Sequence, residues 1–214
     1  MAEIYDFSKA REYKLYSALK PLARVVCKTL YRCTYIGKEN IPKTGGFILA
    51  CNHQSAFDPI TLGGCGLRVF HFMAKEELFR NPALAKFLTH LNAFPVVRGK
   101  GDMAAVHYAE EVIKNGWVLG IFPEGTRAED YRPGRGKSGV ALIAKATGAD
   151  VLPVAIYTDQ HYKCGSHLTV RFGKLIRNEE FGFTEEGKSR ELKDATRRIM
   201  GDITALWEEG HCKK

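Results

Sequence analysis

The chain has 214 residues, and 45% of them are hydrophobic, an ordinary share for a globular protein and enough for one domain with a full core. Lysine and arginine total 32 against 24 aspartates and glutamates, so the net charge of +8 favours an anionic partner: nucleic acid, an anionic membrane or a phosphorylated substrate. No apolar stretch has the length of a membrane span and the N-terminus lacks a signal-peptide pattern, so we expect neither.

The six cysteines form no C-x-x-C pair. Such spacing favours reduced thiols in a cytosolic protein over disulfides or a zinc site, and we expect no metal. Cys51 lies near His53 in the sequence, but its place at the end of an apolar run favours a packed core cysteine over a reactive one.

Residues 1–34 carry seven basic and three acidic residues, and therefore half of the excess positive charge. A basic stripe and an apolar stripe recur at helical spacing on opposite sides of this segment. The basic stripe is Lys20, Arg24, Lys28 and Arg32, and the apolar stripe is Leu15, Leu19, Leu22, Val26 and Leu30. Pro21 predicts two helices, the second beginning near that residue. The pattern is typical of helices in a membrane interface, and a terminal helix docked on the domain remains the alternative.

The rest of the chain alternates between strand-like and helix-like segments. We expect strands at 34–36, 47–51, 69–73, 93–97, 117–122 and 151–156, and an outer strand at 168–175. We expect helices after Pro59, over 75–90 with a break at Asn81-Pro82, from Asp102 to Lys114, before Gly148, and from about 186 to 209. The alternation predicts a single α/β domain whose largely parallel or mixed sheet is flanked by helices.

The stretch Asn52-His53-Gln54-Ser55-Ala56-Phe57-Asp58 lies between the strand at 47–51 and the helix after Pro59. Five residues separate His53 from Asp58, so the two side chains meet only if the chain bends between them. If they meet, Asp58 can hold one imidazole nitrogen and leave the other free as a base. Alone, the pair favours a structural interpretation, in which Asp58 caps the helix and His53 hydrogen-bonds to backbone.

Arg98 and the stretch Glu124-Gly125-Thr126-Arg127 also follow predicted strands. Ligands of α/β folds bind beyond the carboxyl ends of strands, so these residues and His53 can share one cleft. Arginine forks suit a phosphate. The sequence lacks the nucleophile motif G-x-S-x-G and the common nucleotide-binding loops. The residues therefore favour direct transfer to a hydroxyl that is activated by histidine on a phosphorylated substrate.

Four blocks, in order, resemble the 1-acyl-sn-glycerol-3-phosphate acyltransferases, also called lysophosphatidic acid acyltransferases. They are Asn52–Asp58 (N-H-x4-D), Phe94–Gly99 (ending in an arginine and a glycine), Phe122–Arg127 (F-P-E-G-T-R) and Val151–Ile156 (centred on a proline). The resemblance covers about residues 33 to 175. It departs from the family's pattern at Ala128, where a serine is frequent, and at Ala56 and Phe57.

The resemblance implies a role for each matched residue. His53 would be the general base and Asp58 would orient it. Arg98 and Arg127, with Lys75, would hold the glycerol phosphate, while Glu124, Gly125 and Thr126 would shape the acceptor site. Acyl-CoA or an acyl-carrier protein would be the co-substrate, and no cofactor is expected. The product would be phosphatidic acid, in phospholipid biosynthesis.

A lipid substrate favours the interfacial interpretation of the N-terminal segment. We therefore expect membrane-associating amphipathic helices at 1–34 and an acyltransferase domain at 35–214, bound peripherally to an anionic membrane on the cytoplasmic face. Alternatives are an acyltransferase acting on glycerol-3-phosphate or another lysolipid, a thioesterase, and a non-catalytic lipid-surface binder. No nucleic-acid partner is expected, because aromatic residues do not interleave with the basic ones beyond the N-terminus.

Overall fold

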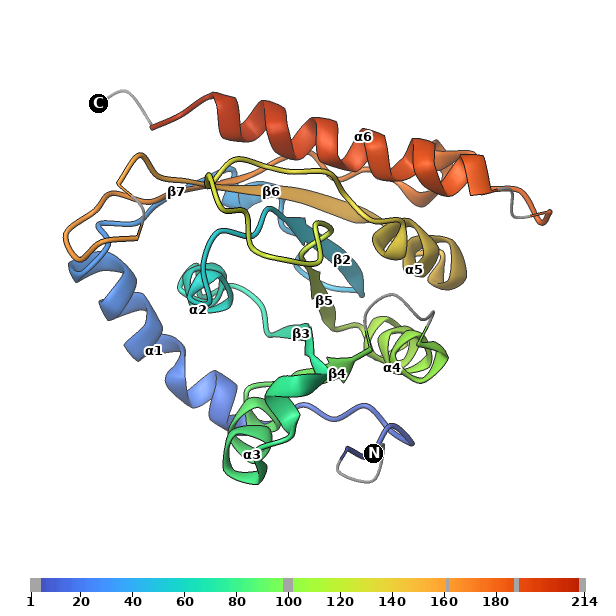
Figure 1. Cartoon of the computed structure of the whole chain (residues 1–214), viewed down its shortest axis with the longest axis horizontal. Coiled ribbons are helices and arrows are strands. Elements are labelled where there is room, and N and C mark those ends of the chain that lie inside the picture. The colour runs from blue at the N-terminus through green and yellow to red at the C-terminus, as the bar shows by residue number, and fades with distance from the viewer. Residues whose placement is uncertain (1–4, 98–101, 161, 187–188, 212–214) are drawn as a thin grey trace.

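The computed structural model describes residues 5–97, 102–160, 162–186 and 189–211. Within these ranges the strands form one sheet in the order β1-β7-β6-β2-β5-β3-β4 (Figure 1). The strands are β1 (Thr34–Ile36), β2 (Phe47–Cys51), β3 (Phe70–Lys75), β4 (Ala93–Val96), β5 (Val118–Ile121), β6 (Val151–Tyr157) and β7 (Thr169–Phe172). Only the β6–β7 pair of this sheet is antiparallel. The predicted mixed sheet is therefore confirmed.

Apart from the N-terminal segment, the helices also lie where the sequence predicted them. They are α1 (Lys14–Thr29), α2 (Asp58–Gly63), α3 (Pro82–His90), α4 (Met103–Lys114), α5 (Gly139–Thr147) and α6 (Ser189–Glu208), with short 3-10 turns η2 (Lys38–Asn40), η3 (Glu76–Phe79) and η4 (Asn178–Phe181). Asn81 caps α3, where its side chain accepts from two backbone N–H groups, and Asp102 caps α4 by accepting from the N–H of Ala105. In the described part of the chain, no helix combines the length and apolarity that crossing a bilayer requires.

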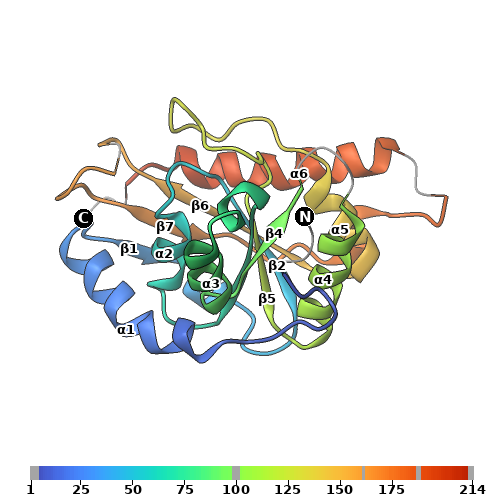
Figure 2. The same ribbon diagram turned by 60° about the horizontal axis from the view of Figure 1, so that its bottom comes forward.

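The sheet is the middle of three layers. Strand β2 alternates between two cores: Ile48 and Ala50 pack with α4, α5 and α6, while Phe47, Leu49 and Cys51 pack on the opposite face toward α2. Figure 2 shows α1, α2 and α3 in front of the sheet and α6 behind it. Because both faces are covered, the strand is buried along its whole length, as its uninterrupted apolar sequence predicted.

Two expectations about individual elements were wrong. Strand β7 is not the outer strand, because the short strand β1 pairs with it and forms the edge. The N-terminal segment forms one helix, which continues through Pro21, rather than two. Pro21 and Ser17 are both exposed, so water can satisfy the carbonyl group that loses its N–H partner to the proline.

Helix α1 packs on α2 through a face that lies between its apolar and basic stripes. Cys27, the buried residue of this helix, faces Gly64. A Cβ atom at Gly64 would lie 2.4 Å from the hydroxyl oxygen of Tyr35 and 2.8 Å from Sγ of Cys27, so only glycine allows this approach. The helix thus docks on the domain and still leaves Leu22 of the apolar stripe 59% exposed and Val25, outside that stripe, 56% exposed.

The sheet order decides which side chains can meet. Strand β2 lies between β6 and β5, and all three are parallel. Their carboxyl ends therefore lie along the same end of the sheet, the edge across the strands. Strand β3 follows β5 along this edge. The segments after β6, β2 and β5 therefore converge beyond the same edge of the sheet.

Candidate active site

His53 and Asp58 meet, as the sequence predicted. The Nδ1 atom of His53 lies 2.7 Å from Oδ2 of Asp58. The Asp58 side chain is fully buried, whereas the imidazole is 15% exposed. With an ionised Asp58, Nδ1 carries the proton and donates, so the lone pair on Nε2 is left to accept a proton. This arrangement is that of a general base held by a carboxylate.

The bend between the two residues is built around the carboxylate of Asp58. Besides the imidazole, Oδ2 accepts hydrogen bonds from the backbone N–H groups of Gln54 and Ser55, at 2.7 and 2.9 Å. The Asp58 N–H in turn donates to the carbonyl of Ser55. The side chain therefore folds the turn that brings it to His53. It does not act as the helix cap that the structural interpretation expected, because the N–H groups it accepts from precede α2 and that helix has no side-chain cap.

Phe122 fixes the plane of the imidazole. The two rings are stacked with centroids 4.1 Å apart and an interplanar angle of 18°. Phe122 is stacked in turn with Phe72 of β3, with centroids 5.8 Å apart. Cys51, just before the site, is fully buried and its burial raises the pKa of the thiol well above its usual value, in agreement with a core cysteine.

Glu124 is tied to the protein backbone through both of its carboxylate oxygens. Oε2 accepts from the N–H of His53 at 2.8 Å, and Oε1 accepts from the N–H of Gly134 at 2.7 Å. The residue is 5% exposed. Burial raises the pKa of Glu124, while the two N–H groups oppose that rise. This side chain joins the His53 segment to the loop before α5.

Tyr162 completes the site, and the sequence analysis did not identify it. Its hydroxyl donates to Oδ1 of Asp58 at 2.5 Å, from the loop after β6. Burial and the adjacent Asp58 raise the pKa of Tyr162 well above its usual value, so the hydroxyl remains a donor. The residue lies 104 positions from Asp58, and no local pattern marks it. Asn52 was also missed as a contact: its side chain pairs with both backbone groups of Ile156 on β6.

The residues predicted to bind the phosphate differ in their exposure and in their partners. Arg127 and Thr126 are exposed, and Gly125 adopts a left-handed conformation with φ +68°. Lys75 ends β3 and forms a half-exposed ion pair with Glu77 at 3.0 Å. Arg98 lies outside the described residues. A further cation comes from the loop before α5: a Cβ atom at Gly125 would lie 3.0 Å from Nζ of Lys137.

Two apolar cavities are lined by the aromatic rings next to His53, one by Phe72 and the other by Phe122. One, of about 310 Å³, lies between α1, α2 and α3 and has Phe72 in its wall. The other, of about 370 Å³, is lined by Phe122 itself, by Gly125 and by residues of α4 and α5. Both volumes suit hydrocarbon chains. Among the residues that the structure describes, no three His, Cys, Asp or Glu side chains gather as a metal site.

Known proteins resemble this chain in sequence and fold. The acyltransferase family model matches residues 32–157. The chain is 40% identical over 119 residues to the 1-acyl-sn-glycerol-3-phosphate acyltransferase of Bacillus subtilis (strain 168), a match that covers 55% of this chain and 59% of the relative. The enzyme of the same name from Streptococcus pneumoniae (strain ATCC BAA-255 / R6) is 32% identical over 183 residues, covering 82% and 66%.

A solved structure agrees with these matches. The crystal structure of the 1-acyl-sn-glycerophosphate (LPA) acyltransferase PlsC from Thermotoga maritima superposes with a TM-score of 0.70 and 27% identity, over 94% of this chain and 81% of that one. The match to the Bacillus relative spans less than two thirds of that relative's length, 59%. The family model covers the segment that contains both His53 and Glu124, and the chain therefore belongs to the acyltransferase family, in the group that resembles 1-acyl-sn-glycerol-3-phosphate acyltransferases.

Proposed function

We propose that this protein transfers an acyl group from an acyl thioester to the sn-2 hydroxyl of 1-acyl-sn-glycerol-3-phosphate and so forms phosphatidic acid. The observation that carries the proposal is the 2.7 Å contact between His53 Nδ1 and Asp58, which leaves Nε2 available as a base. Two apolar cavities are lined by Phe72 and by Phe122, the rings stacked next to His53. The relatives bear the name of this activity.

Nε2 of His53 takes the proton of the acceptor hydroxyl as its oxygen attacks the thioester carbonyl. Asp58 stabilises the imidazolium that forms. The tetrahedral intermediate collapses as the carbon–sulfur bond breaks, and the imidazolium returns its proton to the leaving thiolate. Each turnover thus yields one ester and one thiol, and the base returns to its starting state.

The phosphate of the acceptor needs cations on the same side of the sheet. In this proposal Arg127 follows β5 and Lys75 ends β3, the neighbouring strand, with Arg98 as a third ligand. Glu124 positions His53 rather than touching substrate, because both of its oxygens already accept from backbone N–H groups. Gly125 and Thr126 border the acceptor.

The apolar cavity along α1 favours a lysolipid over glycerol-3-phosphate as the acceptor. The cavity is walled almost entirely by apolar side chains, and a water-soluble acceptor would gain nothing from it. Four exposed apolar residues of its wall form what we call the apolar rim. They are Leu22, Phe57, Ile60 and Phe87.

The apolar rim also supports peripheral binding to a membrane. Its side chains are between 40% and 59% exposed, and together they are unusual for a water-facing surface. Arg24 and Lys28 of the basic stripe are exposed on the same helix, where they can meet anionic head groups. We propose that α1 lies on the cytoplasmic face of an anionic membrane while it remains docked on the domain.

Activity is tested by supplying acyl-CoA or acyl-carrier protein with lysophosphatidate, glycerol-3-phosphate or lysophosphatidylcholine, and by following thiol release and lipid product. His53→Ala should lower kcat about 10²–10⁴-fold with the fold intact by circular dichroism. His107→Ala, an exposed histidine on α4, is the matched control. Persisting turnover in His53→Ala would end the general-base assignment, and faster use of glycerol-3-phosphate would replace the lysolipid as acceptor.

A further inference from the structure

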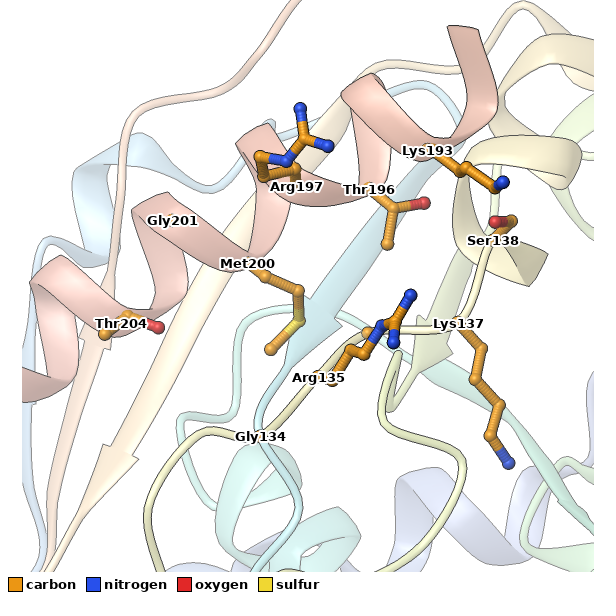
Figure 3. Close-up of a pocket in the computed structure, with 11 residues that line it drawn as sticks. Gly134, Arg135, Lys137, Ser138, Lys193, Thr196, Arg197, Met200, Gly201 and Thr204 are labelled. Carbon is orange, nitrogen blue, oxygen red and sulfur yellow. The ribbon is translucent and has the colours of Figure 1, made fainter. Parts of the chain in front are cut away.

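A second feature lies beside the site, between the loop of residues 132–139 and helix α6. Here the surface forms a groove of about 1040 Å³, which we call the basic groove (Figure 3). Four cationic side chains line it and no acidic side chain does. They are Arg135, Lys137, Lys193 and Arg197.

Three of these cations lack a counter-charge. Arg197 forms an ion pair with Asp194 at 2.7 Å. Arg135, Lys137 and Lys193 form no ion pair with any acid among the described residues. Like charges gathered without partners repel one another, so the cluster is more stable when an anion is bound.

Hydroxyl groups and small residues complete the basic groove. In Figure 3 the side chain of Lys193 extends from α6 toward Ser138, and the Arg135 side chain lies below Thr196. Gly136 lets the loop press on α6, since a Cβ atom there would lie 2.6 Å from Cγ of Met200. Arginine forks, ammonium groups and hydroxyls together are the donors that a phosphate prefers.

The basic groove is connected to the segment of His53 through hydrogen bonds. Gly134 in its wall donates to Glu124, and the same carboxylate accepts from the N–H of His53. Lys137 turns away from α6 in Figure 3 and places Nζ beside Gly125. It lines the basic groove and also the apolar cavity next to Phe122. A ligand can therefore have an anionic part in the groove and an apolar part in that cavity.

The groove and the apolar rim face different surroundings. Helix α6 and helix α1 lie on opposite sides of the sheet (Figures 1 and 2). If α1 contacts the membrane, the basic groove faces water. A lipid acceptor arrives from the membrane, so the groove suits the substrate that arrives dissolved and carries phosphates.

We propose that the basic groove binds the phosphorylated nucleotide part of a coenzyme A thioester, the soluble acyl donor. This inference rests on the proposed acyl transfer. A concave site of this size fits a small phosphorylated molecule, whereas a carrier protein needs a contact area of roughly 800 Å² on a broader surface. Arg135 and Lys193 hold the phosphates from the two walls, and Lys137 lies where the groove meets the apolar cavity next to Phe122.

The test measures binding of coenzyme A itself, by calorimetry, so that it needs no turnover. Arg135→Ala and Lys193→Ala should each raise the Kd for coenzyme A about tenfold, and more at low salt. Arg132→Ala in the same loop and Arg190→Ala on the same helix remove an equal charge outside the groove and should change the Kd less than threefold or so. Coenzyme A without its 3′-phosphate should bind more weakly to the wild type.

Steady-state kinetics separates this inference from the proposed function. Arg135→Ala and Lys193→Ala should raise the KM for acyl-CoA and leave the KM for lysophosphatidate unchanged. Equal Kd values in all four variants, a raised KM for the lysolipid instead, or activity with acyl-carrier protein without binding of coenzyme A would each overturn the inference while the acyl transfer stands. If the wild type shows no turnover, while Arg135→Ala and Lys193→Ala still weaken the binding of coenzyme A, only the proposed acyl transfer would be overturned.

Discussion

The carboxylate of Glu124 holds the backbone of His53, with Oε2 accepting from the His53 N–H at 2.8 Å. Its other oxygen accepts from Gly134, so one buried side chain fixes the base relative to the loop before α5. The orientation of the imidazole thus depends on contacts at both ends of the residue: Glu124 at the backbone and Asp58 at Nδ1. The carboxylates of Glu124 and Asp58 therefore position His53, in addition to any part that charge plays in the chemistry.

Replacing Glu124 by glutamine should therefore lower kcat rather than raise KM. Glutamine has one acceptor oxygen, so its NH₂ group would face the N–H of His53 or of Gly134, and the segment would shift. A misplaced base should cost about 10–100-fold in kcat. Glu129→Gln, an exposed acid of the same loop, is the matched control. A selective rise in the KM for the lysolipid would show that Glu124 contacts substrate after all.

Removing the hydroxyl of Tyr162 should weaken the base without disturbing the fold. In Tyr162→Phe the buried carboxylate of Asp58 loses one donor, which leaves its position less defined and its charge less balanced. We expect kcat to fall about 5–50-fold with both KM values nearly unchanged. Tyr157→Phe, on the preceding strand and packed against Trp207, serves as the control. An unaltered kcat would remove Tyr162 from the machinery of the site.

The elements of this fold could be predicted because each has local signals. Polar caps such as Asn81 and Asp102 precede helices, and the uninterrupted apolar run at 47–51 belongs to a strand covered on both faces. The pairing of His53 with Asp58 was also predictable, since both lie on one turn. Such features depend on interactions within a few residues.

What the sequence could not give depends on contacts between distant segments. Tyr162 reaches Asp58 because β6 lies next to β2, an order that no local pattern encodes. The motif F-P-E-G-T-R reads the same whether the carboxylate of Glu124 faces a substrate or a backbone N–H, so the sequence does not distinguish the two roles. Helix α1 continues through Pro21 because docking on α2 outweighs the lost hydrogen bond, which is a tertiary effect.

The apolar side of α1 should govern binding to membranes. Val25 is 56% exposed and lies outside the wall of the neighbouring cavity, so Val25→Glu alters the surface without touching the proposed substrate path. If the helix binds membranes, the Val25 side chain is buried among the lipids. Replacing it by a charged one should lower partitioning into anionic vesicles about tenfold. Met103→Glu places the same charge on an exposed residue of α4 and should have no effect. Equal partitioning of both variants in a sedimentation assay would mean that α1 only docks on the domain.

His71 should make the fold sensitive to acid. The residue is fully buried, its ring stacks on Trp117 at 4.9 Å, and Nε2 lies 3.2 Å from the carbonyl oxygen of Arg11, to which it can donate. Burial lowers the pKa of His71 from 6.5 to about 4. Between these values the unfolded chain binds a proton that the folded protein does not, so stability is present above pH 6.5 and decreases as the pH falls toward 4.

The size of this effect follows from the pKa difference. Between pH 7 and about pH 4.5 the free energy of unfolding should fall by about 2.5 kcal/mol through His71 alone. His71→Gln keeps an N–H donor for the Arg11 carbonyl but does not titrate, so its urea midpoint should fall less over the same interval. His107→Gln, at an exposed position of α4, should retain the full wild-type dependence. If His71→Gln loses as much stability as the wild type, the acid sensitivity comes from the carboxylates, and the buried imidazole does not drive it.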